Sequence, residues 1–372
     1  MILPTQHLRA IINGKAPMII SSQGIRDEQI QMATVDTSLG NMVYRMKASA
    51  LPSSGETVSS LIDRFCAYDF EIKPKGAFLE KGVCYLIPLN ESFALGNNYQ
   101  VNFSPKSSIG RTDTFVRALI DRHTQYDRAD HGYKGPLYLE VVPLSFDINI
   151  THLLEMIQFR VRTGECLVKS AEFNLMHSQQ GILHHKDGHP LNHDEIDMFN
   201  DSVYFHIDLD RDIVGFESRS NAVTALDLSK KDFYEVEDFW VPIKRPKNNE
   251  LVTSPDKFYL FTTRERVKIP KNCCAELMVY DVSAGEYRSH YAGFFDNDFG
   301  FEDGGTHVVL EVRPRDVPRR FFHNQRVCRM FFEKTDEIPD KLYGESAGSS
   351  YYGPNPSHSK HFKDREAVWC SR

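Results

Sequence analysis

Short hydrophobic runs separated by polar turns dominate the pattern along both halves of this chain. The runs are rich in Val, Ile, Tyr and Phe, and Gly, Pro, Asn and Asp interrupt them roughly every 8 to 12 residues. Runs of this length and composition predict β-strands, and their regular spacing favours a barrel or a sandwich. We therefore predict an all-β protein in which helix is a minor component.

Helical periodicity is confined to short segments. Residues 5–12 place Thr5 as an N-cap and Gly14 just beyond the end. Residues 58–68 carry apolar side chains at helical spacing, including Leu61 and Phe65. The sequence thus predicts a few short helices beside the strands.

The order of features in the first half recurs in the second. Residues 136–143 read PLYLEVVP and residues 307–314 read HVVLEVRP, so the shared Leu-Glu-Val-x-Pro places Glu140 opposite Glu311. Residues 33–36 are matched with residues 224–227 in the same way. The offset is 227 − 36 = 191 at the start and 311 − 140 = 171 at the end, a drift that loops of unequal length would explain.

The length also favours two copies, since 372 residues exceed what one hydrophobic core usually serves. We predict a first domain over 1–170 and a second over 206–335. Residues 171–205 are polar and rich in His and Gly, which is typical of a linker or a closing arm. Residues 336–372 contain a Gly- and Ser-rich stretch and are predicted as a C-terminal arm.

A phosphate-binding composition follows the apolar run that ends at residue 103. Ser107 and Ser108 offer hydroxyl donors, Gly110 lets the backbone approach a ligand closely, and Lys106 and Arg111 supply positive charge. Turns of this kind are also common on surfaces. The segment is a candidate site for a small anionic ligand.

Glu140 and Glu311 each lie inside an apolar strand. If such a glutamate points inward, burial raises its pKa and suits it to moving protons near neutral pH. If it points outward, it merely faces solvent. The pattern alone leaves both interpretations open.

Taken together, these segments resemble dCTP deaminases, and specifically the long tandem form within the dUTPase-like superfamily. Residues 30–40 resemble the family's Q-P-A-S-x-D-x-R-L-G motif, residues 106–111 its R-S-S-L-A-R motif, and residues 130–135 its D-P-G-W-x-G motif. Glu140 lies in the strand that resembles the one holding the catalytic glutamate. The resemblance covers most of the chain and implies two distorted, jelly-roll-like β-barrels.

The resemblance also implies roles for single residues. Ser107, Ser108 and Arg111 would contact the nucleotide, Asp130 would read the deoxyribose, and Gln179 resembles a closing-arm glutamine that touches phosphate. In the family the glutamate activates a water for attack at cytosine C4 and then protonates the leaving ammonia, without zinc.

The second half departs from the family pattern at one motif. Residues 281–288 stand where Ser-Ser is expected, whereas residues 292–300 resemble the sugar-and-base hairpin better than the first half, where Tyr126 takes the place of a small residue. Two arrangements stay open. One site joins the residues Ser107, Ser108 and Arg111 to Ala292, Asp296 and Glu311; alternatively the first domain keeps a full site with Glu140 and the second is scaffolding.

Composition and charge narrow the function classes. The net charge of −7 argues against sequence-independent binding of nucleic acids. No apolar run is long enough to span a membrane, and the seven scattered cysteines suit a reducing compartment, so we expect a cytoplasmic protein. A zinc deaminase is not indicated, because Cys273 and Cys274 are adjacent rather than spaced as Cys-x-x-Cys.

We therefore expect deamination of dCTP to dUTP and ammonia, with Mg2+ bound to the triphosphate. The alternatives are a dUTP pyrophosphatase, a bifunctional enzyme that forms dUMP, and a non-catalytic nucleotide-binding regulator. From the family we also expect a homo-oligomer with three-fold assembly and possible feedback by dTTP.

Overall fold

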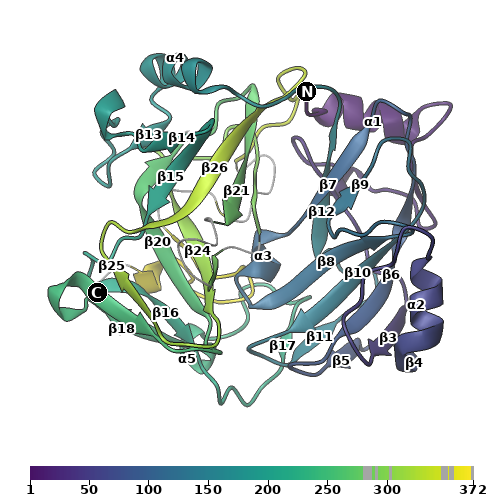
Figure 1. The fold of residues 1–372 in the computed structure, drawn as a ribbon. Helices are drawn as coiled ribbons and strands as arrows, with labels where there is room; N and C mark the ends of the chain where they lie inside the picture. Colours follow the sequence, from purple (N-terminus) through teal and green to yellow (C-terminus); the bar gives the residue numbers. More distant parts are fainter. Residues whose placement is uncertain (280–286, 290–291, 301–303, 345–350, 352–355, 370–372) are drawn as a thin grey trace. The chain divides into compact units, whose positions relative to one another are not determined.

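The computed structural model describes residues 1–279, 287–289, 292–300, 304–344, 351 and 356–369. The chain forms two compact units (Figure 1). The first unit comprises Met1–Cys166, Val223–Lys230 and Thr335–Lys341, and the second comprises Leu167–Ala222, Lys231–Lys334 and Leu342–Arg372. The first unit therefore takes two segments from the second half of the chain.

The first unit is built on a sheet with the order β4-β3-β6-β10-β8, to which β1 adds by pairing with β6. Two smaller sheets have the orders β2-β12-β7-β9 and β17-β11-β5. The strands of this unit are β1 (Ile19–Ser21), β2 (Val35–Asp36), β3 (Met42–Met46), β4 (Cys66–Glu71), β5 (Ala77–Leu79), β6 (Tyr85–Ala94), β7 (Gln100–Pro105), β8 (Thr114–Ile120), β9 (Arg128–Ala129), β10 (Lys134–Pro143), β11 (Ile148–Ile150), β12 (Ile157–Arg162) and β17 (Leu226–Asp227).

The second unit repeats this topology. Its larger sheets have the orders β18-β16-β20-β24-β22, with β13 paired to β20, and β14-β15-β26-β21-β23, and β19 pairs with β25. Its strands are β13 (Leu183–His184), β14 (Met198–Phe199), β15 (Ser202–His206), β16 (Ile213–Ser218), β18 (Trp240–Lys244), β19 (Glu250–Thr253), β20 (Tyr259–Val267), β21 (Cys273–Val279), β22 (Tyr287–Ser289), β23 (Phe294–Phe295), β24 (Thr306–Pro314), β25 (Arg319–Phe322) and β26 (Arg326–Lys334).

The internal repeat extends to single hydrogen bonds. Tyr85 lies beside Val141, and its hydroxyl accepts from the N–H of Glu80 at 3.0 Å. Tyr259 lies beside Val312 and accepts in the same way from Ser254 at 2.9 Å. The prediction of two all-β copies is confirmed, and Glu140 and Glu311 occupy matching places in β10 and β24.

Alternation along β10 explains how a glutamate is buried within an apolar strand. Leu137, Leu139 and Val141 are fully buried on one face of the sheet, and Glu140 points to the other. That face is covered by α2 (Val58–Phe65), which lies beside β3 and β4 (Figure 1). The Glu140 side chain is only 3% exposed, so its carboxyl group is withdrawn from bulk water.

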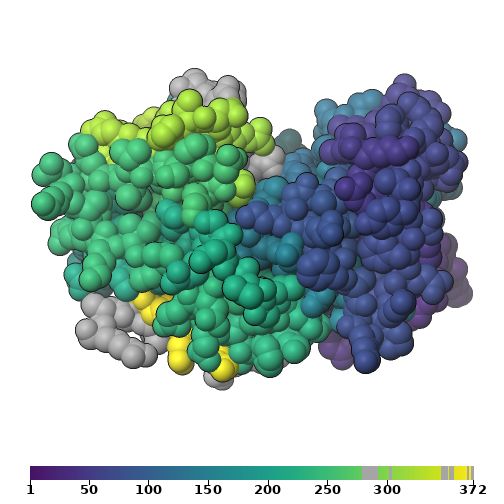
Figure 2. All heavy atoms as spheres, turned by 90° about the horizontal axis from the view of Figure 1, so that it is seen from below, coloured from purple at the N-terminus to yellow at the C-terminus, as the bar shows by residue number. Residues whose placement is uncertain are grey.

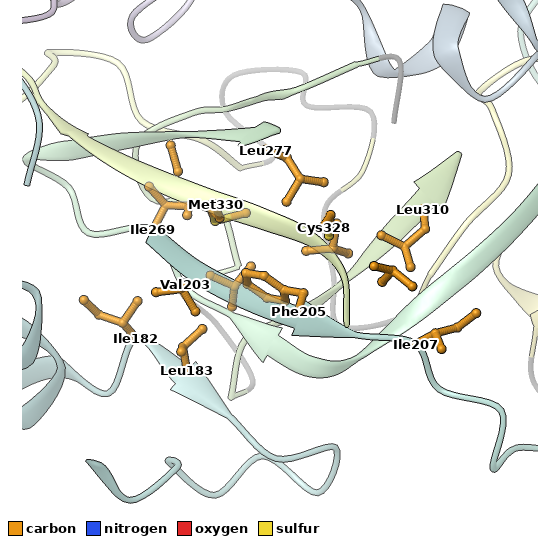
Figure 3. Close-up of a cluster of buried hydrophobic side chains, with 14 of the residues drawn as sticks. Ile182, Leu183, Val203, Phe205, Ile207, Ile269, Leu277, Leu310, Cys328 and Met330 are labelled. Atoms are coloured by element: carbon orange, nitrogen blue, oxygen red, sulfur yellow. The ribbon is translucent and has the colours of Figure 1, made fainter. Parts of the chain in front are cut away.

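The core of the second unit fills the space between its two larger sheets. Figure 3 shows Val203 and Phe205 of β15 close to Cys328 and Met330 of β26, with Leu310 of β24 nearby. All five side chains are nearly or fully inaccessible to solvent. Burial of apolar surface in a continuous layer of this kind is the main contribution to the stability of such a unit.

The α-helices are short, and the longest, α4, has 11 residues. The α-helices are α1 (Thr5–Asn13), α2, α3 (Ser107–Gly110), α4 (Ser170–Gln180) and α5 (Val236–Phe239). Single 3-10 turns are η1 (Asp27–Gln29), η2 (His193–Glu195), η3 (Lys247–Asn249) and η6 (Ala367–Trp369). The two helices predicted near residues 5 and 58 are present, and α2 begins with Thr57 accepting the N–H of Ser60 at 3.2 Å.

Strand register corrects one part of the predicted repeat. Phe159 pairs with Val35, and its counterpart Met330 pairs with Val203, so Asp36 corresponds to Tyr204 and not to Asp227. Asp227 lies in β17, which belongs to the first unit. The four-residue match between 33–36 and 224–227 was too short to fix the alignment, whereas the hydrogen-bonded ladder does fix it.

The described parts of both predicted arms are folded. Residues 171–205 contain most of α4, β13, β14 and the start of β15, all within the second unit. Residues 335–341 belong to the first unit, and residues 356–369 pack on the second, where Figure 2 shows C-terminal atoms in yellow against green ones. Most of the predicted Gly- and Ser-rich arm, 345–350 and 352–355, lies outside the described residues.

Candidate active site

Glu140 is enclosed by three side chains from separate segments of the first unit. Ser49 donates its hydroxyl hydrogen to Oε1 at 3.0 Å, and the thiol of Cys84 lies 3.5 Å from Oε2. The hydroxyl of Tyr126 lies 3.4 and 3.5 Å from the two carboxyl oxygens and 2.9 Å from the Ser49 hydroxyl. Each contact on the carboxylate is thus made by a hydroxyl or thiol of the same unit.

Burial affects the protonation of the Glu140 carboxyl group. Desolvation raises the pKa of Glu140, while its hydrogen bonds and the charge of Arg117 oppose the rise. Burial likewise raises the pKa of Tyr126 to about 12 and raises the pKa of the Cys84 thiol. Tyr126 and Cys84 therefore keep their protons at neutral pH and act as hydrogen-bond donors.

Tyr126 is held in place from its ring side. The Arg117 guanidinium lies 5.0 Å from the centre of the ring and forms an ion pair with Asp127. Asp127 also accepts the N–H of Ala118 at 2.7 Å, which ties the 121–127 loop to β8. The ring packs against the small apolar cluster under α2 that includes Leu86 and Leu119.

Glu311 has a different environment in the second unit. It is 1% exposed, and its Oε2 accepts a hydrogen bond of 3.0 Å from the main-chain N–H of Ala292. A main-chain donor just ahead of a strand cannot rotate away, so it fixes the direction of the carboxylate. Ala292 is itself buried and adds only a methyl group beside this carboxylate.

The turn after Ala292 forms the predicted hairpin. Phe299 donates its N–H to the carbonyl of Asp296 at 3.2 Å, and Asn297 binds the carbonyl of Lys271 at 2.9 Å. Asp298 takes the left-handed conformation with φ 71°, which Asp tolerates better than most residues. Asp296 is half-buried at the start of this turn.

The corresponding hairpin of the first unit carries Asp130. Tyr133 donates its N–H to the Asp130 carbonyl at 3.1 Å, and Gly132 adopts φ 73°. The exposed Asp130 carboxylate forms an ion pair with Arg128 at 2.8 Å. Asp130 and Asp296 thus hold equivalent positions in the two units.

The predicted phosphate-binding segment forms α3. Ser108 and Gly110 are buried, and Ser107 and Arg111 are partly exposed. The main-chain N–H groups of Gly110 and Arg111 are used inside the turn, at 3.1 Å each. These two N–H groups are therefore not the donors that this segment would offer a ligand.

Lys106 differs from the expectation of a cation available to an anionic ligand. Its ammonium group contacts both Asp36 and Glu155, the latter at 3.1 Å. Burial acts to lower the pKa of Lys106, but the two carboxylates outweigh it and raise that pKa. Lys106 balances buried negative charge on β2 rather than offering free positive charge.

Gln179 lies in the last turn of α4, not in a mobile arm, and it is exposed. The neighbouring histidines have structural contacts. His177 binds the carbonyl of Leu191 at 2.8 Å through Nε2 and accepts the N–H of Ile182 at 3.1 Å through Nδ1. Composition alone suggested a solvated segment because it does not reveal such main-chain partners.

Other predicted features have limited structural coverage. Residues 281–286 of the degraded motif lie outside the described residues. Within the described ranges, no group of three or more His, Cys, Asp or Glu side chains is placed to hold a metal ion. Nor does any helix in the described part of the chain have the length and apolar character to cross a membrane.

No sequence pattern pointed to Ser49 or Cys84 as partners of Glu140, because both residues come from segments that lie far from Glu140 in the sequence.

Comparison with known proteins covers nearly the whole chain. Residues 1–165 match the N-terminal domain model of 2'-deoxycytidine 5'-triphosphate deaminase (DCD), and residues 169–362 match its C-terminal domain model. The crystal structure of 2'-deoxycytidine 5'-triphosphate deaminase from Agrobacterium tumefaciens is 34% identical, with a TM-score of 0.85 over 93% of this chain and 99% of that one.

Two shorter proteins are also similar. A "dCTP deaminase, dUMP-forming" from Hydrogenobaculum sp. is 29% identical over 137 residues, which are 33% of this chain and 73% of that protein. One of the same name from Halobacterium salinarum is 26% identical over 177 residues, which are 46% of this chain and 86% of that protein. With both domain models matched, the chain belongs to the dCTP deaminase family.

Proposed function

We propose that this protein deaminates dCTP hydrolytically to dUTP and ammonia, with Glu311 as the group that moves protons. Membership of the family supports the reaction. The observation that supports Glu311 is its buried carboxylate, oriented by the main-chain N–H of Ala292 at 3.0 Å. A small residue at that position leaves room for a flat base beside the carboxylate.

The proposed chemistry uses one carboxylate twice. Glu311 takes a proton from a water molecule as the water oxygen bonds to C4 of cytosine, and it then delivers a proton to the N4 amino group as the C4–N4 bond breaks. The balance is dCTP plus water giving dUTP plus ammonia. General acid-base catalysis of this kind contributes roughly 100- to 10,000-fold to a rate.

We propose that Ser107, Ser108 and Arg111 bind phosphate, because two hydroxyls and a guanidinium fork match phosphate oxygens. Asp296 is the proposed sugar contact, and Asp130 holds the equivalent turn of the first unit. Mg2+ enters with the triphosphate as its counterion.

The test is turnover of dCTP by the full chain in the presence of Mg2+, followed by chromatography of the nucleotides. We expect dUTP, and a loss of roughly 100-fold or more in kcat for Glu311→Gln. Glu237→Gln is the matched control, since Glu237 is exposed on α5. If wild-type protein binds dCTP without converting it, the regulator alternative replaces the enzyme.

A bifunctional reaction is the second candidate, because both shorter relatives are named dUMP-forming. The same chromatogram distinguishes the two: dUMP with pyrophosphate, and no lag through free dUTP, would favour the bifunctional enzyme. Feeding dUTP alone tests the pyrophosphatase step by itself.

Three further proposals concern the oligomeric state of the protein, its inhibition and its location in the cell. We propose a homo-oligomer with three-fold symmetry, checked by sedimentation, and inhibition by dTTP, checked in the dCTP assay. We also propose a cytoplasmic location, because the seven cysteines are scattered along the sequence without the spacing of a disulfide framework.

A further inference from the structure

Tyr126 and Ala292 hold equivalent places in the two units. Phe103 donates its N–H to the carbonyl of Asp127, the residue after Tyr126, at 2.9 Å. Leu277 donates likewise to Gly293, the residue after Ala292, at 2.7 Å. The short strands β9 and β23 and the aspartates of the two hairpins then follow in the same order. One unit therefore carries a large phenol where the other carries a methyl group.

The phenol of Tyr126 is placed as a ligand would be. Its hydroxyl contacts both oxygens of Glu140 and the hydroxyl of Ser49, while its ring lies between Arg117 and the apolar cluster under α2. The ring thus meets a cation and apolar side chains, and its polar atom meets a buried carboxylate.

We propose that Tyr126 is an internal occupant of the Glu140 pocket, which closes this pocket to a pyrimidine base and makes Glu140 a structural hydrogen-bond acceptor. Removing the phenol should open a site beside Glu140 for a ring of similar size that carries a hydroxyl group. The conclusion that dCTP turnover depends on Glu311 alone rests on the proposed function. The conclusion that Tyr126 occupies the pocket does not depend on the proposed function.

The first test is ligand rescue in Tyr126→Ala, with phenol as the probe. Truncating a packed aromatic ring leaves a cavity, so we expect the melting temperature to fall by about 5 °C or more. Millimolar phenol should restore most of that loss and show saturable binding by calorimetry. Wild type and Tyr68→Ala, whose ring is 52% exposed, should show neither effect.

The second test uses a double variant and asks whether Glu140 accepts the hydrogen bond of the phenol hydroxyl. In Tyr126→Ala/Glu140→Leu, phenol should bind at least about 10-fold more weakly than in Tyr126→Ala, because the hydrogen-bond acceptor is gone. Folded Tyr126→Ala that does not bind phenol would overturn the proposal.

The third test keeps Tyr126 in place and is decisive even if Tyr126→Ala fails to fold. Glu140→Gln should keep kcat for dCTP within about 3-fold of wild type, since Gln can still accept from Ser49 and Tyr126. A loss of 100-fold would make Glu140 the working base and refute the closed pocket. If wild type shows no turnover, the proposed function fails, and phenol binding still decides the occupancy of the pocket.

Discussion

Leu226 of β17 lies directly beside Ile148 of β11 in a parallel pair, and both side chains are fully buried. Leu226 also donates its N–H to the carbonyl of Asp147 at 2.9 Å. A strand from the second half of the chain therefore completes a sheet of the first unit. Residues 335–341 join the same unit, where Asp336 donates its N–H to the carbonyl of Ile2 at 2.9 Å.

We predict that Leu226→Ala destabilises the first unit although it lies in the second half of the sequence. A fully buried Leu changed to Ala should cost about 2 to 5 kcal/mol in the free energy of unfolding. Hydrogen exchange of the amides in β5 and β11 measures the effect. Val223→Ala, at a fully exposed position of the same segment, should change it by less than about 0.5 kcal/mol. Equal effects from both variants would count against β17 as a structural part of the first unit.

Arg111→Lys should weaken binding of the triphosphate without unfolding the protein. Lys keeps the charge but loses the fork that donates two parallel hydrogen bonds to phosphate. Losing one charged hydrogen bond corresponds to roughly a 10- to 100-fold rise in KM for dCTP. Arg122→Lys, at an exposed position, is the control. A lower kcat with unchanged KM would instead place Arg111 near the reacting base.

His307 should make the protein less stable in mild acid. Burial lowers its pKa to about 3, and its Nδ1–H donates to the carbonyl of Thr263 at 2.8 Å. The unfolded chain takes up a proton at this residue below pH 6.5, whereas the folded chain does not until about pH 3. The stability that His307 contributes is thus complete above pH 6.5 and is lost as the pH falls, by up to roughly 4 to 5 kcal/mol.

Urea unfolding of wild type and His307→Gln at pH 7.5 and pH 5 measures this contribution of His307 to the free energy of unfolding. The stability advantage of wild type over His307→Gln should shrink at pH 5, because Gln does not titrate. His189→Gln, at an exposed residue, should leave the pH dependence of wild type unchanged. An advantage that grows in acid would mean that the folded protein binds the proton more tightly than the unfolded chain.

The sequence predicted the strand-rich fold, the repeat and the pairing of Glu140 with Glu311, since each depends on local pattern or on a motif within one strand. It misplaced the counterpart of Asp36, because only the ladder between β15 and β26 shows that Tyr204 stands there. It did not predict Ser49 or Cys84 as partners of Glu140, since chain segments far apart in sequence bring them together. It treated Lys106 as a free cation because composition does not show the two carboxylates that contact its ammonium group.

The contacts of residues 356–369 indicate a folded segment of the second unit and not a free arm. Phe362 is fully buried, with ring contacts to Phe239 at 5.5 Å and Trp240 at 6.3 Å, and it forms a backbone bridge with Tyr234. We predict that Phe362→Ala lowers the stability of the second unit by about 3 to 5 kcal/mol.

Phe233→Ala, whose ring is 50% exposed, should have a much smaller effect in the same urea titration. A free arm would respond differently, because removing an aromatic ring from it changes dCTP binding but not unfolding. Intact stability in Phe362→Ala would therefore restore the arm that the sequence predicted, whereas the expected loss makes residues 356–369 part of the second unit's core.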